Sequence, residues 1–267
     1  MSARSDTAQR FTGRVDDYER YRPRYPVELI ALLQRRCGLL ATDLVADIGA
    51  GTGMLAELFL ANGNAVIGVE PNAEMRASCA RLQLRYPGLT LVDGTAEATT
   101  LQEASVDFIS AGRAFHWFDP ELTRREFSRI LRPGGWVVLV TLRRGRRDTA
   151  QEEAYEQILL DHGVDYREVL EGYRAYDQAE QFFTGGTTIR ESIDRQQAVT
   201  LEELLGQTQS LSVAPMPGHP KYDGMQHALC EHFAQFAEGG LLHVATSCYL
   251  TCIQIAPGDS RSKHRRD

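Results

Sequence analysis

The chain has 267 residues, 43% of them apolar, and a formal net charge of −7 at pH 7. This composition is typical of a globular protein with a sizeable core, and no apolar run approaches the roughly 18 residues that span a bilayer. Residues 258–267 hold four basic and two acidic side chains, a net charge of +2, which leaves −9 for the rest. So acidic a body is a poor partner for nucleic acid or an anionic membrane.

The N-terminus lacks the apolar stretch of a secretory signal, so we expect a cytoplasmic protein. The five cysteines are scattered, and none stands in a CxxC pair with the spacing of a metal site. We therefore predict no metal and expect reduced thiols in the core. The cysteines are Cys37, Cys79, Cys230, Cys248 and Cys252.

The first half of the chain alternates between short apolar runs and segments with helical spacing of apolar residues. Such alternation predicts parallel strands joined by crossover helices. We expect helices at 27–37, 52–62, 73–85 and 121–131, and strands at 43–47, 65–69, 89–92, 106–110 and 136–142. The sequence Arg-Pro-Gly-Gly at 132–135 predicts a turn that precedes the last of these strands.

The pattern changes after residue 142, where a basic linker at 143–148 leads into a second set of elements. We expect helices at 150–163, 165–181, 200–206 and 222–238, and strands at 187–197 and 241–255. Besides His264 in the tail, five histidines fall in this half, in predicted helices and loops, and we expect these five at the surface. They are His162, His219, His227, His232 and His243.

A glycine-rich turn joins the first strand to the next helix. Gly49, Gly51 and Gly53 let a ligand approach the backbone, and the helix that follows presents unpaired N–H groups. Glu70 ends the next strand, and its carboxylate can accept hydrogen bonds from both hydroxyls of a ribose. The arrangement indicates a ligand that carries a nucleoside.

The spacing of the glycines narrows the choice of ligand. A dinucleotide fingerprint is GxGxxG, but this turn is GxGxG and Met54 stands where the third glycine belongs. No GK[ST] follows, so the turn is not a phosphate-binding P-loop. The remaining common ligand of such a site is S-adenosylmethionine, whose ribose carries no phosphate.

Five motifs resemble those of class I S-adenosylmethionine-dependent methyltransferases, in the broad group with the ubiquinone-biosynthesis and trans-aconitate types. They are VADIGAGTGMLA, VIGVEPNAEM, DGTAEAT, AGRAFHWFD and LRPGGWVVL, and the likeness is best over residues 11–142. The resemblance implies S-adenosyl-L-methionine as cofactor and S-adenosyl-L-homocysteine as product. It places Glu70 on the ribose and departs from relatives at Thr95, often Asp, and Arg113, often Gln. The implied cofactor-binding residues in these motifs are Asp47, Gly49, Ala50, Gly51, Gly53, Glu70, Pro71, Asn72, Met75, Thr95, Ala96, Glu97, Arg113 and Phe115.

The N-terminal stretch FTGRVDDYERYRPRYP is similar to one that forms a lid across the cofactor in this group. Tyr18, Tyr21 and Arg22 can share one helical face, which Pro23 then ends. We expect Arg22 to pair with the cofactor carboxylate and Tyr18 to contact the cofactor. Tyr21 is a candidate for substrate contact. The alternative is that these residues only dock a terminal helix.

His116 is the candidate general base, because it follows the fourth strand at the carboxyl end of a parallel sheet. Its unperturbed pKa near 6.5 suits proton removal around neutrality. Trp117 is the candidate wall of the substrate pocket. A packing role for the His116–Trp117 pair remains the alternative.

The expected fold is α/β, a Rossmann-like seven-stranded methyltransferase sheet that is mostly parallel with an antiparallel last strand. An N-terminal helical lid and a helical cap insertion complete it. The expected parts are lid helices at 1–37, the S-adenosylmethionine-binding core at 38–142, the cap at 143–185, the C-terminal part of the sheet at 186–256 and a disordered tail at 257–267.

The predicted function is transfer of a methyl group to a small-molecule acceptor, for which secondary metabolism is one setting. The reaction is an in-line displacement that depends mainly on positioning. Two alternatives stay open. One is a non-catalytic cofactor- or partner-binding module on the same fold. The other is a nicotinamide-dependent oxidoreductase with a degenerate glycine fingerprint.

Overall fold

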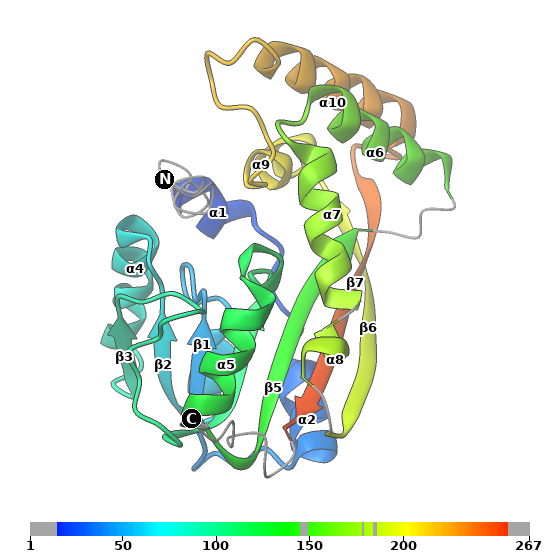
Figure 1. Cartoon of the computed structure of the whole chain (residues 1–267). Helices are drawn as coiled ribbons and strands as arrows, with labels where there is room; N and C mark the ends of the chain where they lie inside the picture. Colours follow the sequence, from blue (N-terminus) through cyan, green and yellow to red (C-terminus); the bar gives the residue numbers. More distant parts are fainter. Residues whose placement is uncertain (1–14, 145–148, 178, 184–185, 256–267) are drawn as a thin grey trace. The chain divides into compact units, whose positions relative to one another are not determined.

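The computed structural model of the chain describes residues 15–144, 149–177, 179–183 and 186–255 (Figure 1). The tail predicted at 257–267 lies outside these residues. Between residues 44 and 144, strands alternate with helices except that β3 is followed directly by β4, as the sequence predicts. None of the helices described there is both long and apolar enough to cross a membrane.

Seven strands form one sheet in the order β3-β2-β1-β4-β5-β7-β6. The pairs among β3, β2, β1, β4 and β5 are parallel, whereas β7 runs in the opposite direction (Figure 1). This confirms the predicted Rossmann-like sheet. The strands are β1 Leu44–Ile48, β2 Ala65–Val69, β3 Leu89–Val92, β4 Val106–Gly112, β5 Leu131–Arg144, β6 Thr188–Val199 and β7 Leu242–Gln254.

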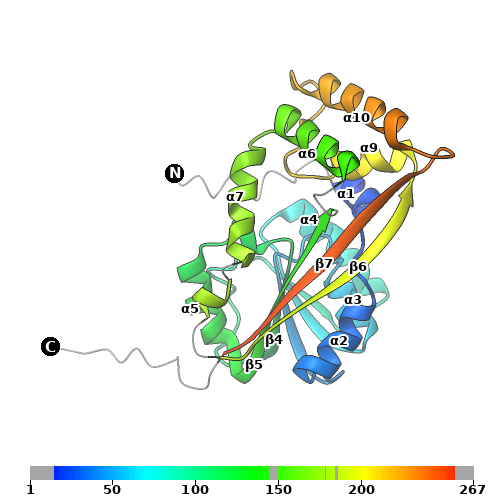
Figure 2. The ribbon, with the colours of Figure 1, turned by 90° about the vertical axis from the view of Figure 1, so that its right-hand side faces the viewer.

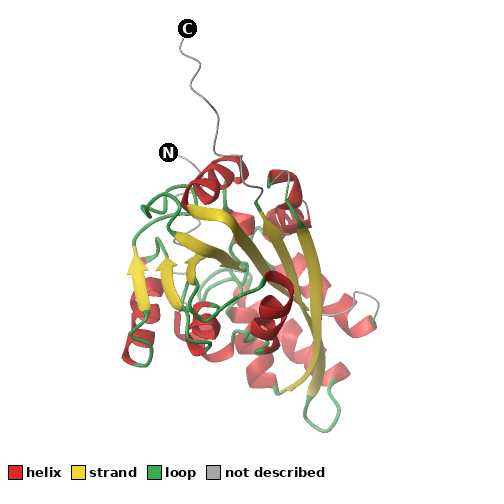
Figure 3. Ribbon diagram, turned by 90° about the horizontal axis from the view of Figure 1, so that it is seen from below, coloured by secondary structure: helices red, strands yellow, loops and turns green. Residues whose placement is uncertain are grey.

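Helices cover both faces of the parallel strands, with α2 and α3 on one face and α5 on the other (Figure 2). Figure 3 shows the strands and their flanking helices from below. Short 3-10 turns follow α4 and β4, at Arg81–Leu84 and Phe115–Trp117. The helices are α1 Val15–Tyr21, α2 Glu28–Cys37, α3 Ala56–Ala61, α4 Ala73–Ala80, α5 Pro120–Ile130, α6 Ala150–His162, α7 Tyr166–Asp177, α8 Ala179–Phe182, α9 Leu201–Gln209 and α10 Tyr222–Phe236.

The described residues group into two compact units, and the boundary falls within the long strands β5, β6 and β7. We call them the sheet unit and the helical unit. The sheet unit takes its described residues from Tyr25–Thr141, Arg174–Glu191 and Tyr249–Asp267. The helical unit takes its described residues from Met1–Arg24, Leu142–Tyr173 and Ser192–Cys248.

The core of the sheet unit forms because its central strands are apolar on both faces. Val45, Ala46 and Ile48 of β1 are completely buried, as expected for a parallel strand covered by helices on both sides. Phe59 of α3 and Phe127 of α5 are completely buried as well. Burial of each of these valine, isoleucine and phenylalanine side chains stabilises the fold by roughly 1.5–3 kcal/mol.

The core of the helical unit lies among α6, α9 and α10. Tyr155, Leu204, Met225 and Leu229 are buried in one apolar cluster. The Tyr155 hydroxyl and Thr208 Oγ1 form a hydrogen bond of 2.9 Å, so the polar end of this buried tyrosine is satisfied.

His232 corrects the expectation that the histidines of the second half lie at the surface. It is only 4% exposed, because it follows Met225 and Leu229 on the buried face of α10 at helical spacing. Its ring lies 5.0 Å from that of Phe236. Burial, and then the nearby positive charge of Arg144, lower the pKa of His232 to about 4.

Cys230 is a second correction, since it is exposed while the other four cysteines are buried. Two predicted boundaries are also wrong. The helix predicted at 52–62 begins at Ala56, because the glycine-rich turn occupies the residues before it. The turn predicted at 132–135 lies inside β5, where the pairing with β4 shifts register.

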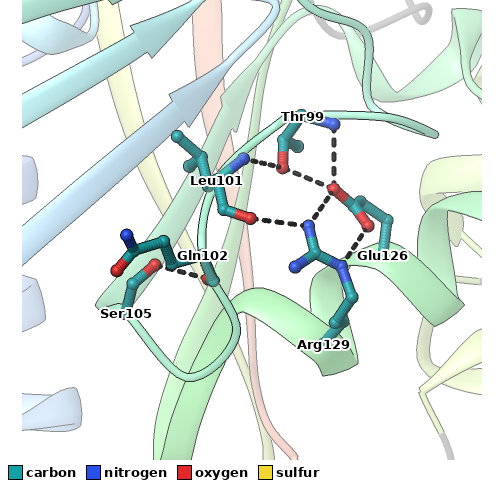
Figure 4. A network of polar contacts seen from close by, with 6 residues as sticks. All are labelled: Thr99, Leu101, Gln102, Ser105, Glu126 and Arg129. Carbon is teal, nitrogen blue, oxygen red and sulfur yellow. Dashed lines mark hydrogen bonds and ion pairs between the residues drawn. The ribbon is translucent and has the colours of Figure 1, made fainter.

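A buried carboxylate, Glu126 of α5, holds the loop that follows β3 (Figure 4). Its Oε1 accepts hydrogen bonds from the backbone N–H of Thr99 at 2.8 Å and the Thr99 hydroxyl at 2.5 Å. Arg129 donates to both carboxylate oxygens and to the carbonyl of Leu101. Burial opposes ionisation, but the bonds from Arg129 and Thr99 outweigh it and lower the pKa of Glu126 to about 2.

We predict that Glu126→Gln lowers the free energy of unfolding at pH 7 by about 1–2 kcal/mol, because an amide loses the charge-assisted bonds. The native pKa lies below the unfolded value near 4.3, so the carboxylate stabilises the fold above that value. This contribution disappears as the pH falls toward 2. Urea unfolding of both proteins at pH 7 and pH 3.5, about a unit below the unfolded value, tests it.

The control for this experiment is Glu121→Gln, which removes an exposed partner of Arg124 and Arg125 on the same helix. Exposed ion pairs contribute little to stability, so this variant should unfold like the wild type. A difference between Glu126→Gln and the wild type that is equally large at both pH values would contradict the assignment.

Candidate active site

The glycine-rich turn has the backbone geometry that its sequence predicts. Gly49 and Gly51 have φ angles of 68° and 58°, in the left-handed region that glycine favours. A Cβ at Gly49 would lie 2.7 Å from the Cβ of Ala114, so only glycine fits there. At Gly51 an added Cβ would meet no atom of the described residues within 4 Å, apart from its own chain neighbours. The turn is therefore packed on one side and open to a ligand on the other.

Glu70 follows β2 and connects the segments on either side of it. Its Oε2 accepts a hydrogen bond from the N–H of Gly51, and its Oε1 accepts one from the N–H of Asn72, both at 2.8 Å. Burial raises the pKa of Glu70 above its ordinary value, although these two bonds and the charge of Arg76 favour ionisation. Each oxygen accepts one of these two bonds and keeps a further lone pair that suits a ligand hydroxyl.

The segment after Glu70 starts helix α4. Asn72 caps this helix, and its side-chain oxygen accepts a hydrogen bond from the N–H of Met75 at 2.9 Å. Both residues are buried, whereas Pro71 between the strand and the cap is exposed. The cap therefore fixes Asn72 and Met75, two of the residues that the resemblance implies for cofactor binding, beside Glu70.

Asp47 lies near the end of β1 and is 1% exposed. Its Oδ1 accepts a hydrogen bond from the hydroxyl of Ser110 at 2.7 Å, and Ser110 stands opposite it in the register of β1 and β4. Burial raises the pKa of Asp47 to about 7, although bonds from Ser110 and the backbone of Ala56 favour the charged form. No sequence signal pointed to Ser110, because strand register is not visible in a single sequence.

The loop after β3 carries three predicted cofactor residues. Thr95 is exposed, Ala96 is 3% exposed, and the backbones of Thr95 and Ala98 form a short antiparallel bridge. Glu97 Oε1 accepts a hydrogen bond from the N–H of Asp119 at 2.8 Å. This bond connects the loop to the start of α5 and so to the turn that holds His116.

His116 and Trp117 lie in the 3-10 turn after β4, and both are half-buried. Their rings are 4.5 Å apart with an interplanar angle of 44°. Phe115, in contrast, is buried and packs edge-on against Phe118. Of the aromatic residues in this turn, His116 and Trp117 therefore offer surface to a small molecule.

Arg113 is a buried cation with a left-handed backbone, φ 55°. Its Nε donates to the hydroxyl of Tyr25 at 3.0 Å, its Nη2 contacts the Sδ of Met54 at 3.4 Å, and its guanidinium lies 4.8 Å from the centre of the Tyr25 ring. Non-glycine residues with positive φ cluster at functional sites. Tyr25 and Arg113 are 88 positions apart, so sequence spacing does not link them.

The sheet order brings most of the predicted site together. Strands β2, β1 and β4 are neighbours, and parallel strands place their carboxyl ends at one edge. Asp47 lies near the end of β1, and the glycine-rich turn, Glu70 and the 113–117 segment follow the ends of β1, β2 and β4. Among the described residues, no group of three or more His, Cys, Asp and Glu is arranged to hold a metal ion.

The three predicted residues from the N-terminal stretch belong to the helical unit. The hydroxyl of Tyr21 donates to Glu202 at 2.7 Å, and Arg22 Nη1 donates to the carbonyl of Ser210 at 3.3 Å. The guanidinium of Arg22 lies 5.3 Å from the centre of the Tyr18 ring. Contact of Tyr18 and Arg22 with a cofactor, and of Tyr21 with a substrate, stays a prediction.

Residues 46–139 match the family described as Methyltransferase domain. An uncharacterized methyltransferase of Mycobacterium tuberculosis is 38% identical over 145 residues, which cover 54% of this chain and 57% of that protein. The chain thus spans little more than half the length of the curated relatives it matches.

Solved structures share the fold. A candidate type II methyltransferase of Anaeromyxobacter dehalogenans has a TM-score of 0.62 at 23% identity, covering 89% of this chain and 99% of its own. An N-methyltransferase of Haemonchus contortus, solved with phosphomonomethylethanolamine and S-adenosylhomocysteine, has a TM-score of 0.56 at 17% identity, covering 96% of this chain and 61% of its own. At these identities the likeness establishes the architecture.

We predict that Asp47→Asn gains stability relative to the wild type as the pH rises. The native pKa of Asp47, about 7, lies above the unfolded value near 3.9, so the wild type loses stability between these two values. Asparagine has no charge to bury and keeps an oxygen for the Ser110 hydroxyl. Urea unfolding measures the free energy of unfolding of the variant minus that of the wild type. Between pH 4.5 and pH 8 this difference should increase by about 2 kcal/mol or more in favour of the variant.

Ser110→Ala is the companion variant. It removes a bond that favours the Asp47 carboxylate, so its stability should fall more steeply with pH than that of the wild type. If Asp47→Asn and the wild type differ by the same amount at both pH values, Asp47 does not titrate as the structure indicates.

Proposed function

We propose that this chain transfers a methyl group from S-adenosyl-L-methionine to a small-molecule acceptor, on the premise that residues 46–139 match the family described as Methyltransferase domain. One observation carries the proposal: a turn that is open at Gly51 and bonded to the carboxylate of Glu70. The bound cofactor supplies a methyl group that its sulfonium already activates. The protein therefore contributes binding, orientation and exclusion of water.

Glu70 is the proposed ribose ligand. Its two oxygens are fixed by the N–H groups of Gly51 and Asn72, so the carboxylate cannot rotate away from the turn. The remaining lone pairs suit the two hydroxyls of a ribose. The absence of a side chain at Gly51 leaves room for the ligand beside this carboxylate. The residues present thus fit a nucleoside cofactor without a phosphate.

Asp47 is proposed to hold the elements around the glycine-rich turn in place. Its carboxyl is buried and bonded to Ser110 and to the backbone of Ala56, the first residue of α3. It therefore ties β4 and the start of α3 to β1, on either side of the glycine-rich turn. Asn72 and Met75 are proposed to lie near the adenine. Its edge is proposed to contact the Thr95 hydroxyl, the Ala96 backbone or Glu97.

The acceptor side is proposed at the turn after β4. His116 and Trp117 are half-buried there, and the imidazole can accept a proton when the acceptor is a hydroxyl or an ammonium. Trp117 provides an apolar wall next to it. Arg113, buried behind this turn, places a fixed positive charge near the same edge of the sheet.

Calorimetric titration with S-adenosylhomocysteine tests the proposal, with NADH as the control ligand. We expect binding of S-adenosylhomocysteine alone, with a dissociation constant in the micromolar range. A protein that binds neither ligand would favour a partner-binding module on this fold, and a protein that binds only NADH would favour an oxidoreductase.

We predict that Glu70→Ala weakens S-adenosylhomocysteine binding at least about ten-fold, because two hydrogen bonds to a charged acceptor are lost. The measurement is the same titration, made after the variant is shown to be folded by circular dichroism. Glu121→Ala, at an exposed position of α5, is the control and should bind like the wild type. Unchanged affinity in Glu70→Ala would rule out the ribose assignment.

We predict that His116→Ala lowers turnover about 100-fold or more while its affinity for S-adenosylhomocysteine stays within about two-fold, as expected for loss of a general base. Turnover is measured with an acceptor found by screening for methyl transfer. His227→Ala, at an exposed position of α10, is the control. Loss of both affinity and turnover would instead identify His116 as a packing residue of the cofactor site.

A further inference from the structure

Helices α1 and α9 of the helical unit lie side by side (Figures 1 and 2), and one glycine sets their separation. Gly206 lies in the interior of α9 and is buried. A Cβ added there would overlap the ring of Tyr21, the last residue of α1. The ring therefore lies directly on the backbone of α9 at Gly206.

A glycine in the interior of a helix needs a reason. It costs about 1 kcal/mol relative to alanine, because its backbone loses more freedom on folding. Helix α9 is otherwise well specified, since Thr200 and Glu203 form a capping box at its start. The close approach of the Tyr21 ring explains the glycine, because any Cβ at position 206 would overlap that ring.

Glu202 adds polar contacts to the same junction. Its Oε1 accepts hydrogen bonds from the Tyr21 hydroxyl at 2.7 Å and from Arg20 Nη2 at 2.9 Å. The side chains of Arg20 and Glu202 are 69% and 68% exposed, and exposed ion pairs contribute little to stability. The ring of Tyr21 on Gly206 is thus the main attachment, and Glu202 sets the direction of the ring.

The residues that follow are held by the same helix. Arg22 comes directly after Tyr21, and its Nη1 donates to the carbonyl of Ser210, just beyond the end of α9. Its guanidinium lies near the ring of Tyr18, one turn back on α1. The placement of Tyr18 and Arg22 therefore depends on how α1 sits on α9.

We propose that Tyr21, Gly206 and Glu202 are positioning residues that hold Tyr18 and Arg22 in place as cofactor ligands. The inference rests on the proposed function, because it takes these two residues to contact S-adenosylmethionine. It gives Tyr21 a role that acts through α1 instead of a contact with substrate. The N-terminal helix then binds cofactor only while it is attached to α9.

Limited trypsin digestion of the full chain tests the attachment without any ligand. Among the described residues around the junction, trypsin can cleave after Arg20 and Arg24. It does not cleave after Arg22, because Pro23 follows. In Gly206→Ala the ring of Tyr21 must move, so cleavage there should accelerate about ten-fold as the helix opens more often. Gln207→Ala, the next residue of α9, is the control and should digest like the wild type.

A double-mutant cycle separates attachment from a general loss of stability. Tyr21→Ala should accelerate cleavage to a similar extent as Gly206→Ala. Without the ring, an added methyl at position 206 has nothing to displace, so the double variant should be no worse than Tyr21→Ala alone. Additive effects in the cycle would overturn the contact between Tyr21 and Gly206 as the attachment.

Titration with S-adenosylhomocysteine tests the functional half. We expect Gly206→Ala to weaken binding about ten-fold, the loss of one charge-assisted hydrogen bond, and to have no further effect in an Arg22→Ala background. Tyr21→Phe, which keeps the ring, should restore most of the affinity that Tyr21→Ala loses. Faster cleavage with unchanged affinity would overturn the positioning role.

The two hypotheses fail in different ways. If the wild type does not bind S-adenosylhomocysteine, the proposed function fails, although the digestion rates still differ between Gly206→Ala and Gln207→Ala. If the wild type binds and the digestion rates do not differ, the attachment fails while the proposed function stands.

Discussion

The proposed site depends on two hydrogen bonds that the carboxylate of Glu70 accepts. It accepts the N–H of Gly51 in the turn after β1 and the N–H of Asn72 at the start of α4. One side chain therefore sets the spacing between two segments that follow neighbouring strands. Asn72 then caps α4, and Asp47 ties the turn to β4 from the other side. Because Glu70 and Asn72 bond to backbone N–H groups, the geometry of the edge is set before any ligand binds.

Burial disfavours the charged form of an ionisable group, so it raises the pKa of an acid and lowers the pKa of a base. Hydrogen bonds and charges from neighbouring residues decide the final pKa. Asp47 is raised to a pKa of about 7 and His232 is lowered to about 4, because in both cases burial disfavours the charged form. Glu126 is buried as well, yet its pKa is lowered to about 2, since Arg129 and Thr99 stabilise its charge. The bonds from Arg129 and Thr99 thus keep Glu126 ionised. Asp47 has fewer hydrogen-bond donors, so its pKa lies near 7 beside the glycine-rich turn.

The parts of this fold that local patterns specify were predictable from the sequence. The strand–turn–helix at 44–61 and the acidic end of β2 follow from apolar runs, glycine spacing and one carboxylate. Contacts between distant positions were not predictable, because a single sequence does not show strand register or side-chain direction. Ser110 under Asp47 and Tyr25 beside Arg113 are of this kind. His232 was misplaced because an isolated polar residue on an apolar helix face looks like surface until the packing of that face is known.

The proposed methyl transfer would make such indirect contacts important. In that reaction the cofactor brings its own reactive carbon, so the protein would contribute mainly orientation, which can be worth roughly 7–11 kcal/mol in favourable cases. Orientation depends on every contact that fixes a ligand-binding residue, including contacts that never touch the ligand. On the proposed function, the bond from the Asp119 N–H to Glu97 and the ring of Tyr21 on Gly206 are of this type. A residue such as Gly206 has no functional group, but its missing side chain determines where α1, and with it Arg22, is held.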